Sequence, residues 1–355
     1  MNPILANPFR ALGLIANSSE REIQKQVSTF SAYARVGKPI ESDCDFPLLP
    51  PVERTEETIR AAAGKIEQPV NRLHYALFWF LSSNHIDETA LGYLRNNDSA
   101  KAAEIWNLAV LDKSITAKNF SAAHNLATLQ FLFSSLNGSL NPAIFESAVR
   151  LKGKAVSECF DEFTRQVAGD KVSADRLEIL KLFSDDIIRF SDLHNGHLAI
   201  LVNAFTEFPA NIRSYVVGKV IDRPVANIRE QIEEAVAARV DNPEDAEIFG
   251  DELYEASIED LNMLRSILGP EHPQFQMIAN DLANELLQCS IDFFNEFADS
   301  DIDPGEDALR LISYARSVGP TGAVKHRLEE NAPTIERWVA ETANRTLNKS
   351  VSTDI

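Results

Sequence analysis

Apolar residues recur along this chain at spacings of three and four positions, which is the period of an α-helix. Ile23, Val27 and Phe30, for example, share one face of such a segment. Strand-like alternation is nearly absent, and its only candidate is the short stretch 213–221 (RSYVVGKVI). The pattern therefore predicts an all-α protein.

Residues that favour helix starts divide the first 85 positions into four predicted helices. The four start signals are the pair Asn7–Pro8, the capping box of Ser19 with Glu22, the threonine Thr55 and the proline Pro69. Proline is tolerated in a first turn and not in a helix interior, so the fourth helix is expected to run over 69–83. Phe78 and Trp79 make that segment apolar on nearly all sides, and it is expected to be buried.

A long loop separates the second and third of these helices. Residues 38–54 (KPIESDCDFPLLPPVER) contain four prolines and no helical period. The part from 46 to 51 has polyproline character, so it is stiff and loses little entropy on docking. If Phe46, Leu48 and Leu49 are exposed, they form a candidate surface for a partner. The alternative is that they pack against the protein's own fourth helix.

From about residue 87 onward the chain shows pairs of helices joined by short loops. Residues 99–136 are expected to form two antiparallel helices joined near 114–119, and Asn141 with Pro142 to begin another. Such pairs suggest a helical-repeat or solenoid arrangement. No fixed period of about 34 residues is present, and a tetratricopeptide-like pattern occurs faintly in one place, around Trp106.

Negative charge is concentrated in one block of the chain. The 355 residues carry a net charge of −19, and residues 226–309 hold 22 acidic residues against 3 arginines, which leaves the remainder neutral. Such a block repels DNA and anionic lipid, so we expect neither a nucleic-acid nor a membrane partner. It is either a solvated helix surface or a docking face for a basic partner. We divide the chain into 1–85, a helical hairpin region 86–220 and an acidic helical region 221–355.

The sequence contains no signal for secretion, membrane insertion or cysteine chemistry. No run of about 18 apolar residues occurs, and the start MNPILANPFR lacks the basic and apolar regions of a secretion signal. Cys44, Cys159 and Cys289 are odd in number, far apart and without CxxC spacing. We therefore expect a cytoplasmic protein without disulfides or a zinc site.

Motifs of catalysis and metal binding are also missing. Residues 299–310 begin like a calcium loop, but Pro304 and Arg310 replace the required glycine and glutamate. We interpret Asp303–Pro304 as a helix start instead. His194 and His197 flank a glycine that favours a turn, and His124 lies in an apolar helix pattern typical of a core histidine. No phosphate-binding loop or nucleophile motif occurs. We expect no catalytic residue, metal or cofactor, although an all-α enzyme with a scattered site stays open.

The first 80 or so residues, about a quarter of the chain, resemble a J-domain, the helical module of the DnaJ co-chaperones. NPFRALGL is similar to the family's small first helix ending in Leu-Gly, and SSEREIQKQ to its second helix start. The end of the third helix, A-x-x-x-L-x-D-P-x-x-R in the family, is similar to AAGKIEQPVNR through Ala63, Ile66, Pro69 and Arg72. The resemblance implies a four-helix bundle. The whole architecture resembles bacterial proteins that join such a module to a tetratricopeptide-like body.

The chain departs from the family at its functional motif. In the family, a His-Pro-Asp triplet between the second and third helices drives ATP hydrolysis by the heat-shock ATPase chaperone. Here that loop has no histidine, and Asp45-Phe46-Pro47 is the nearest fragment. The second helix, basic in the family, has a net charge of only +2 over residues 18–38.

The resemblance therefore implies a J-like module kept for packing or binding. We predict a non-catalytic, chaperone-associated adaptor or scaffold that binds a protein or peptide, with the heat-shock ATPase itself as one candidate partner. The alternative is an active co-chaperone that works by a non-standard route. The candidate partner-binding residues are Arg21, Lys25, Arg35, Lys38, Phe46, Leu48 and Leu49.

Overall fold

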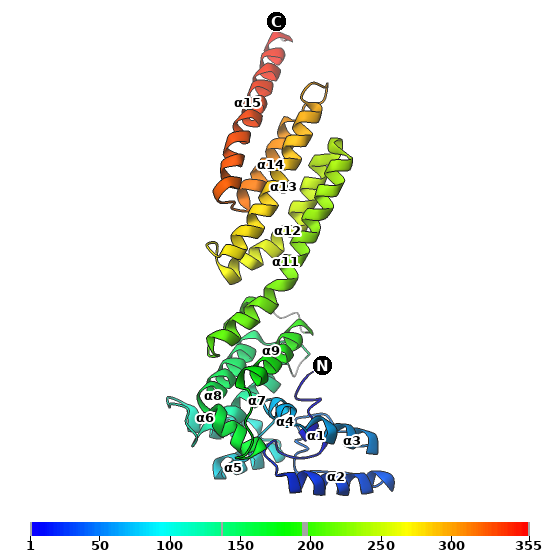
Figure 1. Ribbon diagram of the computed structural model, residues 1–355, viewed down its shortest axis with the longest axis vertical. Helices are drawn as coiled ribbons and strands as arrows, with labels where there is room; N and C mark the ends of the chain where they lie inside the picture. The colour runs from blue at the N-terminus through cyan, green and yellow to red at the C-terminus, as the bar shows by residue number, and fades with distance from the viewer. Residues whose placement is uncertain (1, 136–137, 194–197, 354–355) are drawn as a thin grey trace. The chain divides into compact units, whose positions relative to one another are not determined.

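The structure is a computed structural model that describes residues 2–135, 138–193 and 198–353. Every regular element in those ranges is a helix, which confirms the predicted all-α class. The chain divides into two compact units, residues 1–218 and residues 219–355, and each is described by itself. The division falls within one long helix, α11 (Ala210–Asp241) (Figure 1).

Unit 1 begins with four helices whose starts agree with the sequence signals. They are α1 (Pro8–Ala11), α2 (Glu20–Arg35), α3 (Glu56–Lys65) and α4 (Pro69–Ala76). The side chain of Asn7 accepts a hydrogen bond from the amide of Phe9, and Ser19 and Glu22 form the expected capping box. Helix α2 packs against α3, while α1 contacts α3 and α4.

The fourth helix ends at Ala76, seven residues before the predicted end, and the chain continues as a turn and an extended segment. Asn125 holds the extended backbone by accepting from the Leu81 amide and donating to its carbonyl, both at 2.8 Å. Asn17 forms the same double contact with Ser82, at 3.0 and 2.9 Å. These side-chain amides satisfy backbone groups that a longer helix would have paired internally.

The rest of unit 1 is a series of helices, of which the first four pack successively along the chain. They are α5 (His85–Arg95), α6 (Ser99–Val110), α7 (Phe120–Phe133), α8 (Pro142–Ala168), α9 (Arg176–Leu193), α10 (Leu198–Ala204) and the start of α11. The pair predicted within 99–136 is α6 and α7, and the series is solenoid-like. The stretch 213–221, the one candidate strand, is helical and lies within α11.

The first four helices share a core with the helices that follow them. Helix α4 packs against α8 and α9. Just beyond it, the ring of Phe78 stacks on Phe183 with centroids 4.9 Å apart, and Phe80 stacks on Trp106 at 5.9 Å. Residues 1–85 therefore belong to the same compact unit as most of region 86–220.

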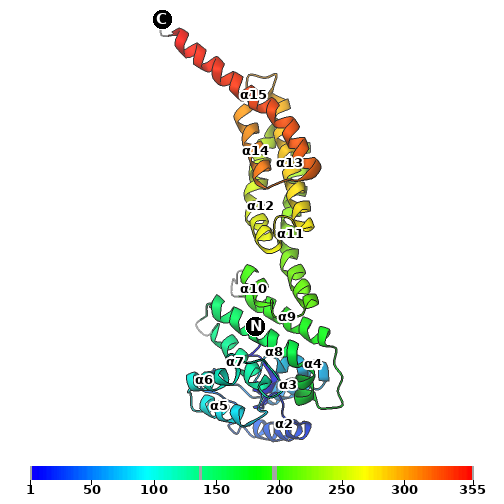
Figure 2. The same ribbon diagram turned by 90° about the vertical axis from the view of Figure 1, so that its left-hand side faces the viewer.

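Unit 2 is a helical bundle that contains the whole acidic block. After α11 it comprises the 3₁₀ turn η1 (Pro243–Asp245) and α12 (Ala246–Leu268), α13 (Pro273–Phe297), α14 (Gly305–Ser317) and α15 (Gly322–Thr353). Helices α12, α13 and α14 lie side by side (Figures 1 and 2). The predicted helix start at Asp303–Pro304 lies one residue later: Pro304 is the N-cap, and Asp303 Oδ1 accepts from the Gly305 amide.

Most acidic side chains of unit 2 face solvent. Of the 22 within residues 226–309, 16 are exposed, which fits the interpretation as a solvated surface. The buried exception is Glu285, whose carboxylate accepts from Arg239 at 2.7 Å. Arg239 also pairs with Asp292, so this arginine joins α11 to two turns of α13. No helix among the described residues is both long and apolar enough to cross a bilayer.

Candidate protein-binding surface

Three of the predicted basic residues lie on one exposed line along α2. Arg21, Lys25 and Arg35 fall at helical spacing with Ser28 and Ala32, and all five side chains are exposed. Positions separated by four, three, four and three residues lie on the same face of a helix. We call these five residues the α2 stripe. The opposite side of α2 is buried in unit 1.

The two ends of the α2 stripe differ in how their charge is compensated. At the end nearest the loop, Arg35 Nη2 lies 2.8 Å from Glu56 Oε1 on α3. The hydrogen bond to Glu56 raises the pKa of Arg35, and the same contact lowers the pKa of Glu56. Lys38 follows the helix, exposed, with Nζ 4.3 Å from the centroid of the Tyr33 ring. The two basic residues at the start of the stripe make no ion pair with any described residue.

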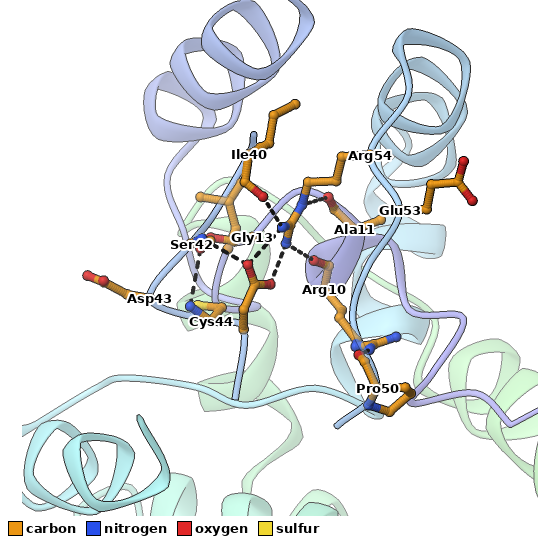
Figure 3. A network of polar contacts seen from close by, with 12 residues as sticks. Arg10, Ala11, Gly13, Ile40, Ser42, Asp43, Cys44, Pro50, Glu53 and Arg54 are labelled. Atoms are coloured by element: carbon orange, nitrogen blue, oxygen red, sulfur yellow. Dashed lines mark hydrogen bonds and ion pairs between the residues drawn. The ribbon is translucent and has the colours of Figure 1, made fainter. Parts of the chain in front are cut away.

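The loop between α2 and α3 is held by Arg54 (Figure 3). Its Nε donates to the Ala11 carbonyl at 2.9 Å, Nη1 to the Ile40 carbonyl at 3.2 Å, and Nη2 to the Arg10 carbonyl at 3.1 Å. The two terminal nitrogens also donate to the two oxygens of Asp45, at 2.8 and 2.5 Å. All five guanidinium N–H groups thus have an acceptor, which is the full donor capacity of arginine.

These contacts tie the loop to the end of α1. The last carbonyls of a helix have no partner within it, and Arg54 supplies one for Ala11 and adds to the Gly13 amide at the Arg10 carbonyl. Ser42 adds a hydrogen bond from Oγ to the Gly13 carbonyl at 2.6 Å. Gly13 has a φ of +65°, and a Cβ there would lie 2.5 Å from the Cβ of Ser42, so this close approach requires glycine.

Of the two alternatives for the apolar loop residues, exposure and internal packing, internal packing holds for two of the three. Phe46 is 1% exposed, and its ring centroid lies 5.4 Å from that of Phe80. Leu49 is 8% exposed, and Leu48 is half-buried. The alternative that the loop packs on the protein's own core describes Phe46 and Leu49, because an aromatic cluster beyond α4 takes up the Phe46 ring.

Asp45-Phe46-Pro47, the fragment nearest to the family's triplet, is therefore engaged in contacts within the protein. The carboxylate of Asp45 is occupied by Arg54, and the next side chain, Phe46, lies in the core. Burial raises the pKa of the adjacent Cys44 thiol to about 12, so this cysteine is not a nucleophile at neutral pH. Sequence reasoning missed Arg54, since a single arginine at the end of a proline-rich loop matches no motif.

The pockets and titratable side chains elsewhere in the described chain do not form a recognisable catalytic or metal site. A pocket of about 280 Å³ lies at the end of α8 and is lined by residues of 160–165 and 169–174. No three His, Cys, Asp or Glu side chains converge as metal ligands would, within the part of the chain that the structure describes. His194 and His197 lie outside the described residues. A buried lysine, Lys152 on α8, lies beside a small cavity.

No protein-family model matches the chain, and no curated protein or solved structure is significantly similar to it. The structure itself defines an all-α, solenoid-like protein. Its first unit presents an exposed, partly basic helix face next to a loop whose central side chains are engaged internally.

Proposed function

We propose that this chain is a non-catalytic protein-binding adaptor whose first four helices act as a J-like docking module in a chaperone system. The observation that carries the proposal is the contrast between the exposed α2 stripe and the anchored loop beside it. The stripe offers a surface for a partner. The loop offers no side chain equivalent to the family's triggering triplet.

The anchored loop supports binding without stimulation of an ATPase. Giving a partner the full Asp45 carboxylate and the Phe46 ring would break the bidentate pair with Arg54 and remove a buried ring from its aromatic neighbours. The Asp45 side chain is 29% exposed, so breaking the pair costs less than the about 3–5 kcal/mol of a fully buried pair, and exposing an aromatic side chain costs about 1.5–3 kcal/mol more. An active co-chaperone with a non-standard route would have to meet both costs at each encounter.

The chemistry of the α2 stripe favours an acidic protein surface as the partner. Arg21 and Lys25 are exposed cations without a described ion pair, while the neighbouring Glu20 pairs with Arg72 and Glu22 accepts from the Ser19 amide, so both cations are available to a partner carboxylate. Ser28 and Ala32 are small, so they let another backbone approach the middle of the helix. Complementary charge at such an exposed surface gives orientation and a faster association rate.

The test compares binding and turnover with the purified heat-shock ATPase of the same organism. The variant Arg21→Glu with Lys25→Glu reverses the free end of the stripe. The matched control, Lys118→Glu with Lys171→Glu, makes the same charge change at two other exposed positions. We expect the first variant to weaken binding about tenfold or more, which is about 1.4 kcal/mol, and the control to bind like the parent chain.

The same preparation tests the non-catalytic part of the proposal. We expect the steady-state ATPase rate to be unchanged when the chain is added. A stimulated rate would contradict an adaptor without activating function. Equal loss of binding in both variants, or no binding by the parent chain, would contradict docking through the α2 stripe.

A further inference from the structure

The pocket at the end of α8 has the size of a small-molecule site. Its volume of about 280 Å³ lies close to the lower end of the range for ligand pockets, about 300–1,000 Å³. Helix α8 ends at Ala168, and Gly169 follows with a φ of +93°, a conformation that favours glycine. The last turns of the helix and the segment that follows it line the pocket together.

One hydroxyl in the lining has no hydrogen-bond partner. Thr164 on α8 is 6% exposed, and its Oγ1 is buried and unpaired. The hydroxyl of a helical threonine often donates to the carbonyl four residues earlier, as Thr128 does to His124 at 2.9 Å. For Thr164 that residue is Phe160, which directly follows a break in the helix at Cys159 (φ −130°, ψ 36°). Because a buried hydroxyl without a partner is unfavourable, a ligand that pairs with Thr164 gains affinity.

The charges around the pocket favour a cation. Asp161 and Asp170 are exposed in its lining and make no ion pair within the described part of the chain. Arg165 is the one cationic residue that the described chain contributes to the lining, and it pairs with Glu162. Lys171 is exposed and does not line the pocket. Three carboxylates thus face one guanidinium, and the C-terminal end of a helix adds partial negative charge.

The remaining lining is apolar. Phe160, which is 7% exposed, contributes an aromatic ring, and Val172 and Ala174 contribute aliphatic groups. A methylene chain can pack against these side chains while a charged group at its end stays among the carboxylates, as the stems of lysine side chains do on protein surfaces. The lining therefore fits a molecule with an apolar stem and a cationic end.

We propose that this pocket binds a short aliphatic diamine. An ammonium group has three N–H donors and no acceptor, so it matches the carboxylates of Asp161 and Asp170 and the free lone pairs of the Thr164 hydroxyl. The methylene stem packs on Phe160 and Val172. A dicarboxylate of the same length would meet like charges in the same positions. The pocket shares no residue with the α2 stripe, so this inference does not depend on the proposed docking function.

The test titrates the full chain with putrescine (1,4-diaminobutane) at pH 7 and low salt, followed by isothermal titration calorimetry. We expect saturable binding at one site with a Kd below about 1 mM. The neutral analogue 1,4-butanediol has the same length and should show no measurable binding. The hexamethylated diamine keeps both charges but has no N–H group, and we expect it to bind about tenfold more weakly or worse.

Variants locate the binding site. Asp161→Asn with Asp170→Asn should weaken putrescine binding about tenfold or more. The matched control, Asp112→Asn with Asp222→Asn, makes the same charge change at two other exposed positions and should bind like the parent chain. Thr164→Val should weaken binding about threefold or more without loss of stability, because it removes a buried hydroxyl that has no partner.

Several outcomes would overturn the proposal. Equal weakening in both Asp→Asn pairs would show diffuse attraction of a cation to an acidic chain. Butanediol or the hexamethylated diamine binding as tightly as putrescine would exclude recognition of the ammonium N–H groups. Absence of binding by the parent chain, or unchanged binding by Thr164→Val, would exclude the pocket as the site described above.

Discussion

Arg54 binds both carboxylate oxygens of Asp45, at 2.8 and 2.5 Å, from a side chain that is 2% exposed. The same guanidinium lies 5.1 Å from the ring centroid of Phe30 on α2 and caps the carbonyls of α1. One residue therefore connects α1, α2 and the loop before α3. The rigidity of this loop is a property of that network and not of its prolines alone.

Removing Arg54 should destabilise unit 1 more than removing an exposed arginine. Arg54→Ala removes the side-chain donor of the Ala11 carbonyl, one of the donors of the Arg10 carbonyl and the bidentate partner of Asp45, and we expect a loss of about 2–4 kcal/mol in the free energy of unfolding. Arg60→Ala is the control, because its side chain is 78% exposed and its pair with Glu56 contributes little. Urea denaturation measures both variants. Equal effects would contradict a special role for Arg54.

Gly153 on α8 should not tolerate a methyl group. A Cβ at this position would lie 2.3 Å from the ring of Phe208, whose own surroundings are aromatic. We expect Gly153→Ala to lower the stability of unit 1 by about 1–3 kcal/mol through overpacking. Gly92→Ala on α5 has nothing within 4 Å and should raise stability by about 0.5–1 kcal/mol. Thermal unfolding followed by circular dichroism shows whether each variant is less or more stable than the parent chain.

Helix starts could be predicted from the sequence because their causes are local. The capping box of Ser19 and Glu22 spans four residues, and the proline of a first turn acts at its own position. The end of α4 could not be predicted in this way. The groups that hold the extended segment after it come from Asn17 and Asn125, which are 65 and 44 residues distant from their partners.

In the candidate site, too, the features with local causes could be predicted from the sequence, and those that depend on distant residues could not. The exposure of Arg21 and Lys25 follows from helical spacing, since the apolar residues of α2 define the opposite face. The burial of Phe46 depends on Phe80, and the environment of Asp45 depends on a single arginine, Arg54. A proline-rich loop has no period from which either contact could be inferred. Composition alone therefore left both an exposed and an internally packed loop open, and the fold decides for internal packing of Phe46.

The first 85 residues should not fold as an independent domain. Without the remainder of unit 1, Phe78 loses Phe183 and Phe80 loses Trp106, and the Leu81 backbone loses Asn125. A fragment of residues 1–85 should show poor dispersion of its amide proton resonances in nuclear magnetic resonance spectra and no cooperative unfolding transition. A fragment of residues 1–218 should show both good dispersion and cooperativity. A cooperative transition in the short fragment would contradict the shared core.

Replacing Lys152 by methionine should stabilise unit 1, and the gain should depend on pH. The pKa of Lys152 is lower in the folded chain than in the unfolded chain, so the unfolded state binds more protons and protonation favours unfolding. This penalty grows as pH falls below the unfolded pKa, about 10.4, and is absent above it. We expect Lys152→Met to add about 1–4 kcal/mol at pH 7 and nearly nothing at pH 11.

The matched control is Lys154→Met, two residues along α8 and half-buried, which should change stability by less than about 0.5 kcal/mol at either pH. Urea denaturation at pH 7 and pH 11 gives the difference in the free energy of unfolding between each variant and the parent chain. If Lys152→Met is less stable than the parent chain at pH 7, the two hydrogen bonds to His124 and Thr128 outweigh the cost of keeping the amine neutral. That result would contradict the prediction that Lys152 destabilises the folded chain at pH 7. Its hydrogen bonds would then be sufficient reason for its presence in the core.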